Sequence, residues 1–359
     1  MNKDPFKEYI KESEPEKRVK GYAWHTAIGL QAVDGLKTSQ YLVDTAIRNI
    51  EGDISIDEAS ELLNSYYEEN PKTENDDRTE EADKVALRIA KILSEKAFSF
   101  TPNEYISIHK KLFVGIYKHA GKIRDYNITK KEWVLNGATV MYGSASELRT
   151  TLDYDFSEEK KFSYKNLSMD GIIHHLAVFV SRLWQIHIFA EGNTRTTAVF
   201  FIKYLRTLGF DATNDIFAEN AWYFRNSLVR ANYNNLRNGV HETTEYLELF
   251  LRNLLLEEKN ELHNRSMHIS GSLKADIENT KADIEKILTN IDDVIENKTV
   301  MHVTALYEEC GRNNVFGRSG VERITGLKST RASEIIKLML ENDVIEPVRG
   351  QGKGKYRFK

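Results

Sequence analysis

The residues best suited to chemistry form one short run, His187-Ile188-Phe189-Ala190-Glu191-Gly192-Asn193-Thr194-Arg195. The helical spacing of apolar residues predicts helices at 169–186 and at 193–208, on either side of the run. The run is therefore a short loop on rigid supports, where active sites tend to lie. Within it, His187 titrates near neutral pH and can take a proton from an attacking hydroxyl.

The other residues of the run suit the handling of phosphate. Glu191 offers the hard oxygen ligand that Mg²⁺ takes together with substrate phosphates. Gly192 and Asn193 can turn backbone N–H groups toward one point at the start of a helix, which forms a nest for an anion. Arg195 lies in the first helical turn and can fork onto phosphate oxygens. Together these residues predict phosphoryl or nucleotidyl transfer.

The run resembles the signature of the Fic family, His-x-Phe-x-(Asp/Glu)-Gly-Asn-(Gly/Lys)-Arg-x-x-Arg, at six positions. The resemblance extends over about 42–268, and it implies a protein adenylyltransferase that moves AMP from Mg·ATP to a Ser, Thr or Tyr hydroxyl of a target protein. It implies His187 as the base and Glu191 as the Mg²⁺ ligand. It also implies an anion hole at Gly192 and Asn193, and contact of Arg195 with the β-phosphate.

Two positions depart from the signature. Thr194 replaces Gly or Lys, and Ala198 replaces the final Arg, which in the family holds the γ-phosphate. The hydroxyl of Thr194 or Thr197, or a basic residue from elsewhere in the chain, could substitute. We therefore count Thr194 among the nucleotide-binding residues.

The resemblance implies three further features. A predicted β-hairpin around Asn136-Gly137, over residues 127–140, takes the place of the family's flap, which docks a target segment as an added strand. Asn232 is the candidate for contact with the nucleoside. Glu51 ends a predicted helix and takes the place of the family's inhibitory glutamate, so it is a candidate regulatory residue that could pair with Arg195.

The remaining pattern predicts a mainly α-helical fold with this one hairpin in its body. We divide the chain into an N-terminal helical region (1–80, its first twenty residues loosely held), a catalytic core (81–270), a connector helix (271–298) and a C-terminal unit (299–359). In the last unit, three predicted helices and two short strands around a basic loop have the pattern of a winged helix. Such a unit binds DNA or protein.

Composition and charge limit the cellular location and the kind of protein that we expect. The 359 residues carry a net charge of -4, but the chain from Val300 onward has eleven Lys and Arg against seven Asp and Glu. The start has no apolar secretory segment, no apolar run is long enough to span a membrane, and Cys310 is the only cysteine. We therefore expect a cytoplasmic protein without disulfides or membrane contact. A homodimer stays open.

Two alternatives remain beside the adenylyltransferase. One is a DNA-binding regulator whose Fic-like body senses a nucleotide, and the other is a Fic enzyme that uses another donor, such as UTP, or removes AMP. The enzymatic hypothesis requires the imidazole of His187 to face a cleft beside the amides that follow it, and not packed interior.

Overall fold

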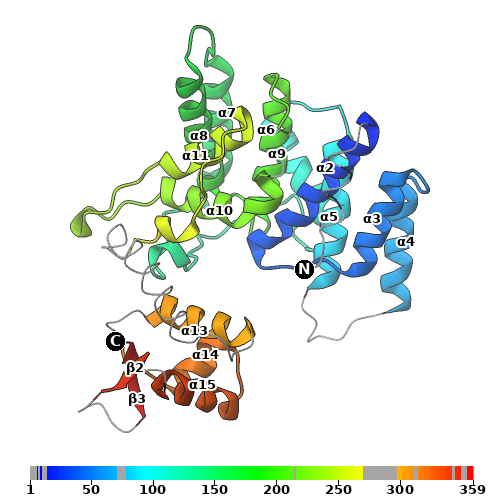
Figure 1. The fold of residues 1–359 in the computed structure, drawn as a ribbon. Coiled ribbons are helices and arrows are strands. Elements are labelled where there is room, and N and C mark those ends of the chain that lie inside the picture. Colours follow the sequence, from blue (N-terminus) through cyan, green and yellow to red (C-terminus); the bar gives the residue numbers. More distant parts are fainter. Residues whose placement is uncertain are drawn as a thin grey trace. The chain divides into compact units, whose positions relative to one another are not determined.

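The computed structural model describes residues 6, 9, 14–70, 78–212, 216–269, 297–310, 314–341, 344–348 and 354–358. The chain divides into two compact units, 1–270 and 271–359 (Figure 1). Among the described residues, no helix is long and apolar enough to cross a membrane.

The first unit is helical throughout its described part. Its α-helices are α2 (Pro15–Gly29), α3 (Gln40–Glu51), α4 (Ile56–Glu69), α5 (Thr79–Ser94), α6 (Pro102–Phe113), α7 (Leu148–Lys161), α8 (Met169–Ile186), α9 (Asn193–Thr207), α10 (Ile216–Ala231) and α11 (Glu245–Leu256). Short 3-10 helices lie at η1 (Leu30–Asp34), η2 (Trp133–Leu135), η3 (Leu236–Asn238) and η4 (Asn264–Met267).

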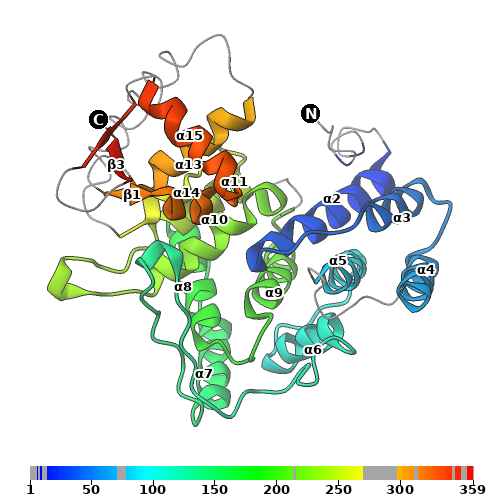
Figure 2. The same cartoon turned by 90° about the horizontal axis from the view of Figure 1, so that it is seen from below.

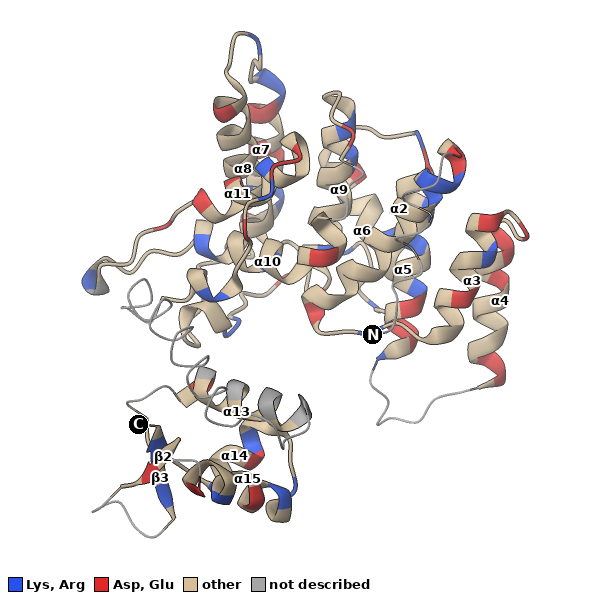
Figure 3. Ribbon diagram, in the orientation of Figure 1, with Lys and Arg blue, Asp and Glu red and all other residues tan. Residues whose placement is uncertain are grey.

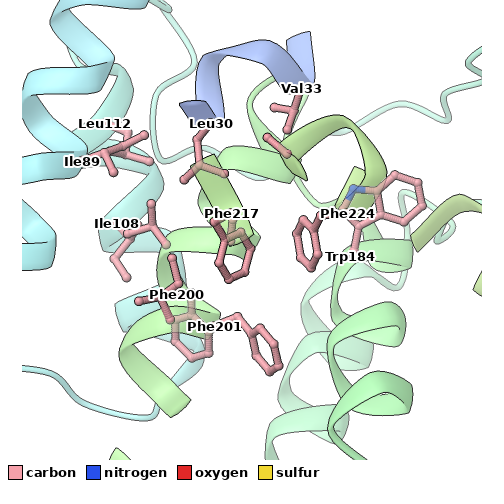
Figure 4. Close-up of a cluster of buried hydrophobic side chains, with 14 of the residues drawn as sticks. Leu30, Val33, Ile89, Ile108, Leu112, Trp184, Phe200, Phe201, Phe217 and Phe224 are labelled. Carbon is pink, nitrogen blue, oxygen red and sulfur yellow. The ribbon is translucent and has the colours of Figure 1, made fainter. Parts of the chain in front are cut away.

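Helix α9 occupies the centre of this unit. It lies between α8 on one side and α5 on the other (Figure 2), and α6 and η1 also pack on it. Because it is surrounded, its residues are buried from Asn193 to Leu205. Phe200 and Phe201 join Trp184 of α8 in the aromatic part of the core (Figure 4). The helix that begins inside the candidate loop is therefore held rigidly.

Polar side chains fix where the helices begin. Thr101 caps α6 and Ser168 caps α8, each accepting a hydrogen bond from a first-turn amide. Ser55 and Glu58 form the predicted capping box of α4. These starts confirm the sequence prediction, and the predicted helix 169–186 matches α8 residue for residue.

The expectation that the first twenty residues are loosely held is wrong from Pro15 onward. Helix α2 packs on α5 and α10. Its buried residues form a consecutive run from Ala23 to Ala27, not a stripe along one face, so helical periodicity gave no signal. Trp24 is fully buried and donates a hydrogen bond from Nε1 to Asn49 Oδ1 at 3.0 Å.

The predicted β-hairpin at 127–140 is also wrong, because this stretch contains no strand. The turn itself forms: Asn136 and Gly137 have φ of +51° and +83°, and the Glu132 amide donates to the Ala138 carbonyl at 2.9 Å. Beyond that bond the ladder stops, since the Lys130 amide donates to the hydroxyl of Thr139. We call residues 127–140 the 127–140 loop.

The second unit combines helices α13 (Asn297–Cys310), α14 (Arg318–Thr325) and α15 (Ser329–Glu341) with a small sheet. Strands β1 (Phe316–Gly317), β2 (Ile345–Pro347) and β3 (Lys355–Phe358) are antiparallel in the order β1-β3-β2. Register pairs are Ile345 with Phe358 and Phe316 with Tyr356. The three helices and the last two strands were predicted, and β1 was not.

Charges of both signs alternate on α14 and α15 (Figure 3). Arg331 pairs with Glu334 at 2.8 Å, and Lys337 lies 3.7 Å from Glu341. The exposed face of α15 is thus mixed rather than uniformly basic, and DNA or protein binding by this unit stays a prediction. The predicted connector helix at 271–298 falls outside the described residues except for its last two positions. Positions 349–353 of the basic loop are outside them as well.

Candidate functional site

The candidate loop closes on itself between α8 and α9. His187 follows the last residue of α8 with left-handed backbone angles, φ 51° and ψ 54°. The side chain of Asn193 then accepts a hydrogen bond from the Phe189 amide (3.0 Å) and donates one to the Phe189 carbonyl (2.8 Å). Asn193 therefore holds the loop in shape with its side chain, and only its backbone N–H is left to face an anion.

A second histidine, which the sequence analysis did not identify, supports the loop from a neighbouring helix. The ring of His109 on α6 stacks on Phe189 with 3.6 Å between centroids. Its Nδ1 accepts from the Gly121 amide at 2.8 Å, so Nε2 carries the proton and donates to the Glu191 carbonyl at 3.0 Å. Because 82 residues separate His109 from Glu191, no local pattern could have found the contact.

His109 predicts acid sensitivity of the fold. Burial lowers the pKa of His109 to about 4, against about 6.5 in an unfolded chain. Between these two pKa values His109 is protonated in the unfolded chain and neutral in the folded chain. The free energy of unfolding therefore falls as pH drops from 6.5 toward 4. We expect His109 to account for a loss of about 2 kcal/mol in the free energy of unfolding between pH 7.5 and pH 5.

The measurement is urea denaturation at the two pH values, for the wild type and for His109→Gln. Glutamine can still accept from Gly121 and donate to Glu191, but it does not titrate. The variant should lose about 2 kcal/mol less than the wild type on acidification. An unchanged pH dependence would show that His109 is not held neutral.

The start of α9 has the features of an anion cradle. Gly192 is the N-cap residue, with φ 76°, and no side chain caps the helix there. A Cβ at this position would lie 2.4 Å from the ring of Phe113, so only glycine fits. Uncapped first-turn amides and the helix dipole favour a phosphate at this point. The carboxylate of Glu191, 53% exposed, lies beside the cradle, 3.5 Å from the Nζ of Lys130.

The imidazole of His187 is covered in this conformation. It is 3% exposed and lies between Tyr142 and Trp184, with ring centroids 4.4 Å and 5.3 Å away. Burial, and secondarily the charge of Lys130, lowers the pKa of His187 well below its ordinary value, so the ring is neutral and able to accept a proton. Neither ring nitrogen has a hydrogen-bond partner among the described residues.

In this conformation the imidazole of His187 does not face a cleft, so the requirement of the enzymatic hypothesis is not met. Its surroundings are not purely apolar, because the cationic groups of Lys130, Arg225 and Arg124 all act on the ring. Arg124 donates from Nε to the His187 carbonyl at 2.8 Å and pins the loop. A substrate hydroxyl reaches the imidazole only if Tyr142 or the 127–140 loop moves.

The guanidinium of Arg195 is engaged inside the fold. The residue is fully buried, and its guanidinium is taken by side chains from outside the motif: Asp34 (2.8 Å from Nε), Gln31 (2.9 Å from Nη1) and Glu81 (2.7 Å from Nη2). These pairs would have to open before Arg195 could hold a phosphate.

The expected pairing of Arg195 with Glu51 is wrong. Glu51 pairs with Lys17 at 2.8 Å, on the exposed surface. The sequence could not have separated these alternatives, because Asp34 and Glu81 are 161 and 114 positions away from Arg195. Regulation by Glu51 stays a prediction without a contact to the motif.

The two threonines of α9 are engaged in the core. Thr194 accepts from the indole Nε1 of Trp184 at 3.0 Å, and Thr197 lies 2.8 Å from the hydroxyl of Tyr105. Ala198 is completely buried. Neither hydroxyl is therefore free to substitute for the missing final arginine.

Asn232 is not brought together with the motif loop. Its Nδ2 donates to the carbonyls of Ser181 and Leu228, at 3.0 Å and 2.9 Å. It lines a separate cavity of about 500 Å³ on the outer side of α8, whose lining includes Arg182 and Gln185 but no residue of 187–195. A role in holding a nucleoside stays a prediction.

The metal would rely on Glu191. Among the described residues, no three His, Cys, Asp or Glu side chains gather into a metal site. Mg²⁺ that is bound with nucleotide phosphates needs only one or two carboxylates from the protein. The exposed carboxylate of Glu191, next to an uncapped helix start, fits that demand.

The match to a protein-family model agrees with the motif. Residues 99–205 match the family model described as Fic/DOC family, a range that includes α6 to α9 and the whole candidate loop. A similar solved structure is a Fic family protein from Desulfovibrio desulfuricans G20, with 11% sequence identity and a TM-score of 0.43 over 99% of this chain and 92% of that one. No curated protein matches the chain.

Proposed function

We propose, from the motif and from the match of residues 99–205 to the Fic/DOC family model, that the protein is an adenylyltransferase, which moves AMP from Mg·ATP to a protein hydroxyl. The observation that carries the proposal is the start of α9. There, uncapped amides, an exposed carboxylate and a neutral imidazole lie within six residues of one rigid loop.

The residues divide the reaction among them. The amides that follow Gly192 hold and orient the phosphates, and Glu191 supplies the protein's ligand to Mg²⁺, which would neutralise phosphate charge. His187 accepts the proton of the attacking hydroxyl. As its oxygen bonds to the α-phosphorus, the bond from that phosphorus to the bridging oxygen breaks and pyrophosphate leaves. Positioning and charge neutralisation provide most of the rate.

Opening of the 127–140 loop belongs to the proposal, since His187 is covered. The ion pair between Lys130 and Glu191 and the pair between Arg225 and Glu132 (2.7 Å) hold this loop down. The first is half-exposed and therefore weak. A target segment that binds beside the loop would have to replace that contact.

The test exposes the purified protein to α-labelled ATP, UTP, GTP and CTP with Mg²⁺, with and without cell lysate. Label should appear on protein with ATP, should require Mg²⁺, and should be absent with γ-labelled ATP, because pyrophosphate leaves. Transfer from UTP alone would redirect the proposal to another donor. Absence of transfer from all four nucleotides would contradict an adenylyltransferase.

A second candidate function is a nucleotide-sensing DNA-binding regulator. The covered His187 and the occupied Arg195 favour it, since both residues are engaged in the fold. Gel-shift binding of DNA by the intact chain, with ATP binding but no label transfer, would support this reading over the enzyme.

A further inference from the structure

We propose that Lys130 of the 127–140 loop is a phosphate-binding residue of the nucleotide site and supplies the cation that the motif itself lacks. The inference rests on the proposed function for the nature of its ligand, a nucleoside triphosphate. It starts from one contact, the 3.5 Å between Lys130 Nζ and Glu191 Oε2, which places an ammonium group beside the carboxylate of the residue that precedes Gly192.

Helix α9 offers no free cation of its own. Arg195 is held by Asp34 and Glu81, and Ala198 carries no charge. Further along the helix, Lys203 donates to the carbonyls of Ile92 and Glu95, and Arg206 donates to a backbone carbonyl as well. A triphosphate carries several negative charges, so a cation for it has to come from another element.

Two other cations act on His187, and both already have hydrogen-bond or ion-pair partners in the fold. Arg124 is used by backbone carbonyls, including those of His187 and Gly143. Arg225 pairs at 2.7 Å with Glu132, which is 1% exposed. Withdrawing Arg225 would leave a buried carboxylate without its partner, which is strongly unfavourable.

Lys130 differs from both in the ease with which its partner can be exchanged. Its ammonium lies at ion-pair distance from a half-exposed carboxylate, a contact that contributes little to stability. Glu191 is also the residue that would ligate Mg²⁺, so binding of Mg·ATP gives the carboxylate a new partner. The ammonium is then free to pair with a phosphate oxygen, and its flexible stem allows it to follow the phosphates.

The position of Lys130 suits the charge that develops in the reaction. Among the cations that act on the His187 ring, Lys130 lowers the pKa of His187 the most. An ammonium group there would offset charge on the phosphoryl group and on the leaving pyrophosphate. A loop that carries this cation would also link closure of the site to the presence of a triphosphate.

The test is calorimetric titration of the full chain with ATP, AMP and adenosine, in Mg²⁺ and separately in EDTA. Lys130→Ala should weaken ATP binding at least about tenfold, should weaken AMP binding less, and should leave adenosine binding unchanged. Lys130→Arg should retain most of the ATP affinity. The matched control is Lys131→Ala, which removes the same charge from the next, exposed position and should bind ATP as the wild type does.

Equal ATP affinity in Lys130→Ala and Lys131→Ala would overturn the inference, as would an equal loss for ATP and adenosine, or a wild type that binds no ATP. Label transfer is measured in parallel. ATP binding that depends on Lys130 without any transfer would remove the enzymatic function and leave Lys130 as the phosphate ligand. Normal AMP transfer and normal ATP binding by Lys130→Ala would support the enzymatic function and exclude Lys130 as a phosphate ligand.

Discussion

Replacing His187 by alanine should lower the rate of AMP transfer by about 10²–10⁴-fold, the usual contribution of a general base. The neutral imidazole is the group of the loop that can accept the hydroxyl proton, and its pKa lies well below the ordinary value because it is buried. Binding of ATP should persist, because the amides that follow Gly192 and the carboxylate of Glu191 are untouched. Transfer is measured with α-labelled ATP, and binding by calorimetry.

The buried position of His187 makes a folding control necessary. His187→Gln keeps most of the volume between Tyr142 and Trp184, so a loss of transfer in both variants cannot be blamed on a cavity. His174→Ala removes an exposed histidine of α8 that pairs with Glu248, and should transfer AMP as the wild type does. If folded His187→Ala transfers AMP at the wild-type rate, the imidazole is only a packing group and the regulator becomes the better reading.

Local sequence signals correctly located the helix boundaries on either side of the candidate site. The boundary of α8, the loop that begins at His187 and the start of α9 at Asn193 all follow from apolar spacing, and Ser168 also caps α8. Such signals act within a few residues, because each helix start is decided by its own first turn. That is why the loop was found without knowledge of the tertiary structure.

What could not be predicted depends on partners far apart in the chain. Asn193 was expected to offer its backbone N–H to an anion, but the sequence did not predict that its side chain closes the loop on Phe189. His109 supports Glu191 across 82 residues, and Arg195 is claimed by side chains from η1 and α5. A motif specifies which residue types are present, whereas the packing of distant helices decides which of their atoms are already used.

Replacing Arg195 by methionine should lower the free energy of unfolding of the first unit by about 2–3 kcal/mol, because buried hydrogen bonds to charged groups are lost. Methionine fills similar space but leaves Asp34 without its cation and takes one of two arginines from Glu81, 9% exposed, which keeps its pair with Arg78 at 2.8 Å. Burial by itself would raise the pKa of Glu81, and hydrogen bonds from Tyr117, Arg195 and Arg78 keep it low, so this carboxylate stays charged beside Tyr117 and Arg78 when Arg195 is lost. The arginine thus acts first as a structural link between α9, η1 and α5.

The measurement is urea denaturation followed by tryptophan fluorescence, which reports the first unit alone because all four tryptophans lie within 1–270. Arg149→Met removes an exposed arginine paired with Asp153 and should cost less than about 1 kcal/mol. Arg195→Lys should recover only part of the loss, since one ammonium cannot serve Asp34, Gln31 and Glu81 together.

Adding Asp34→Asn to Arg195→Met should restore part of the lost stability, because the carboxylate that paired with Arg195 Nε is replaced by a neutral amide. This double variant separates the structural role from phosphate binding. If Arg195 served mainly to bind phosphate, the single variant would have nearly wild-type stability and weakened ATP binding, and Asp34→Asn would have no lost stability to restore. Because Arg195 pairs with Asp34 and Glu81, we expect the opposite result. The free energy of unfolding falls in the single variant, and any loss of ATP affinity is a consequence of the disturbed start of α9.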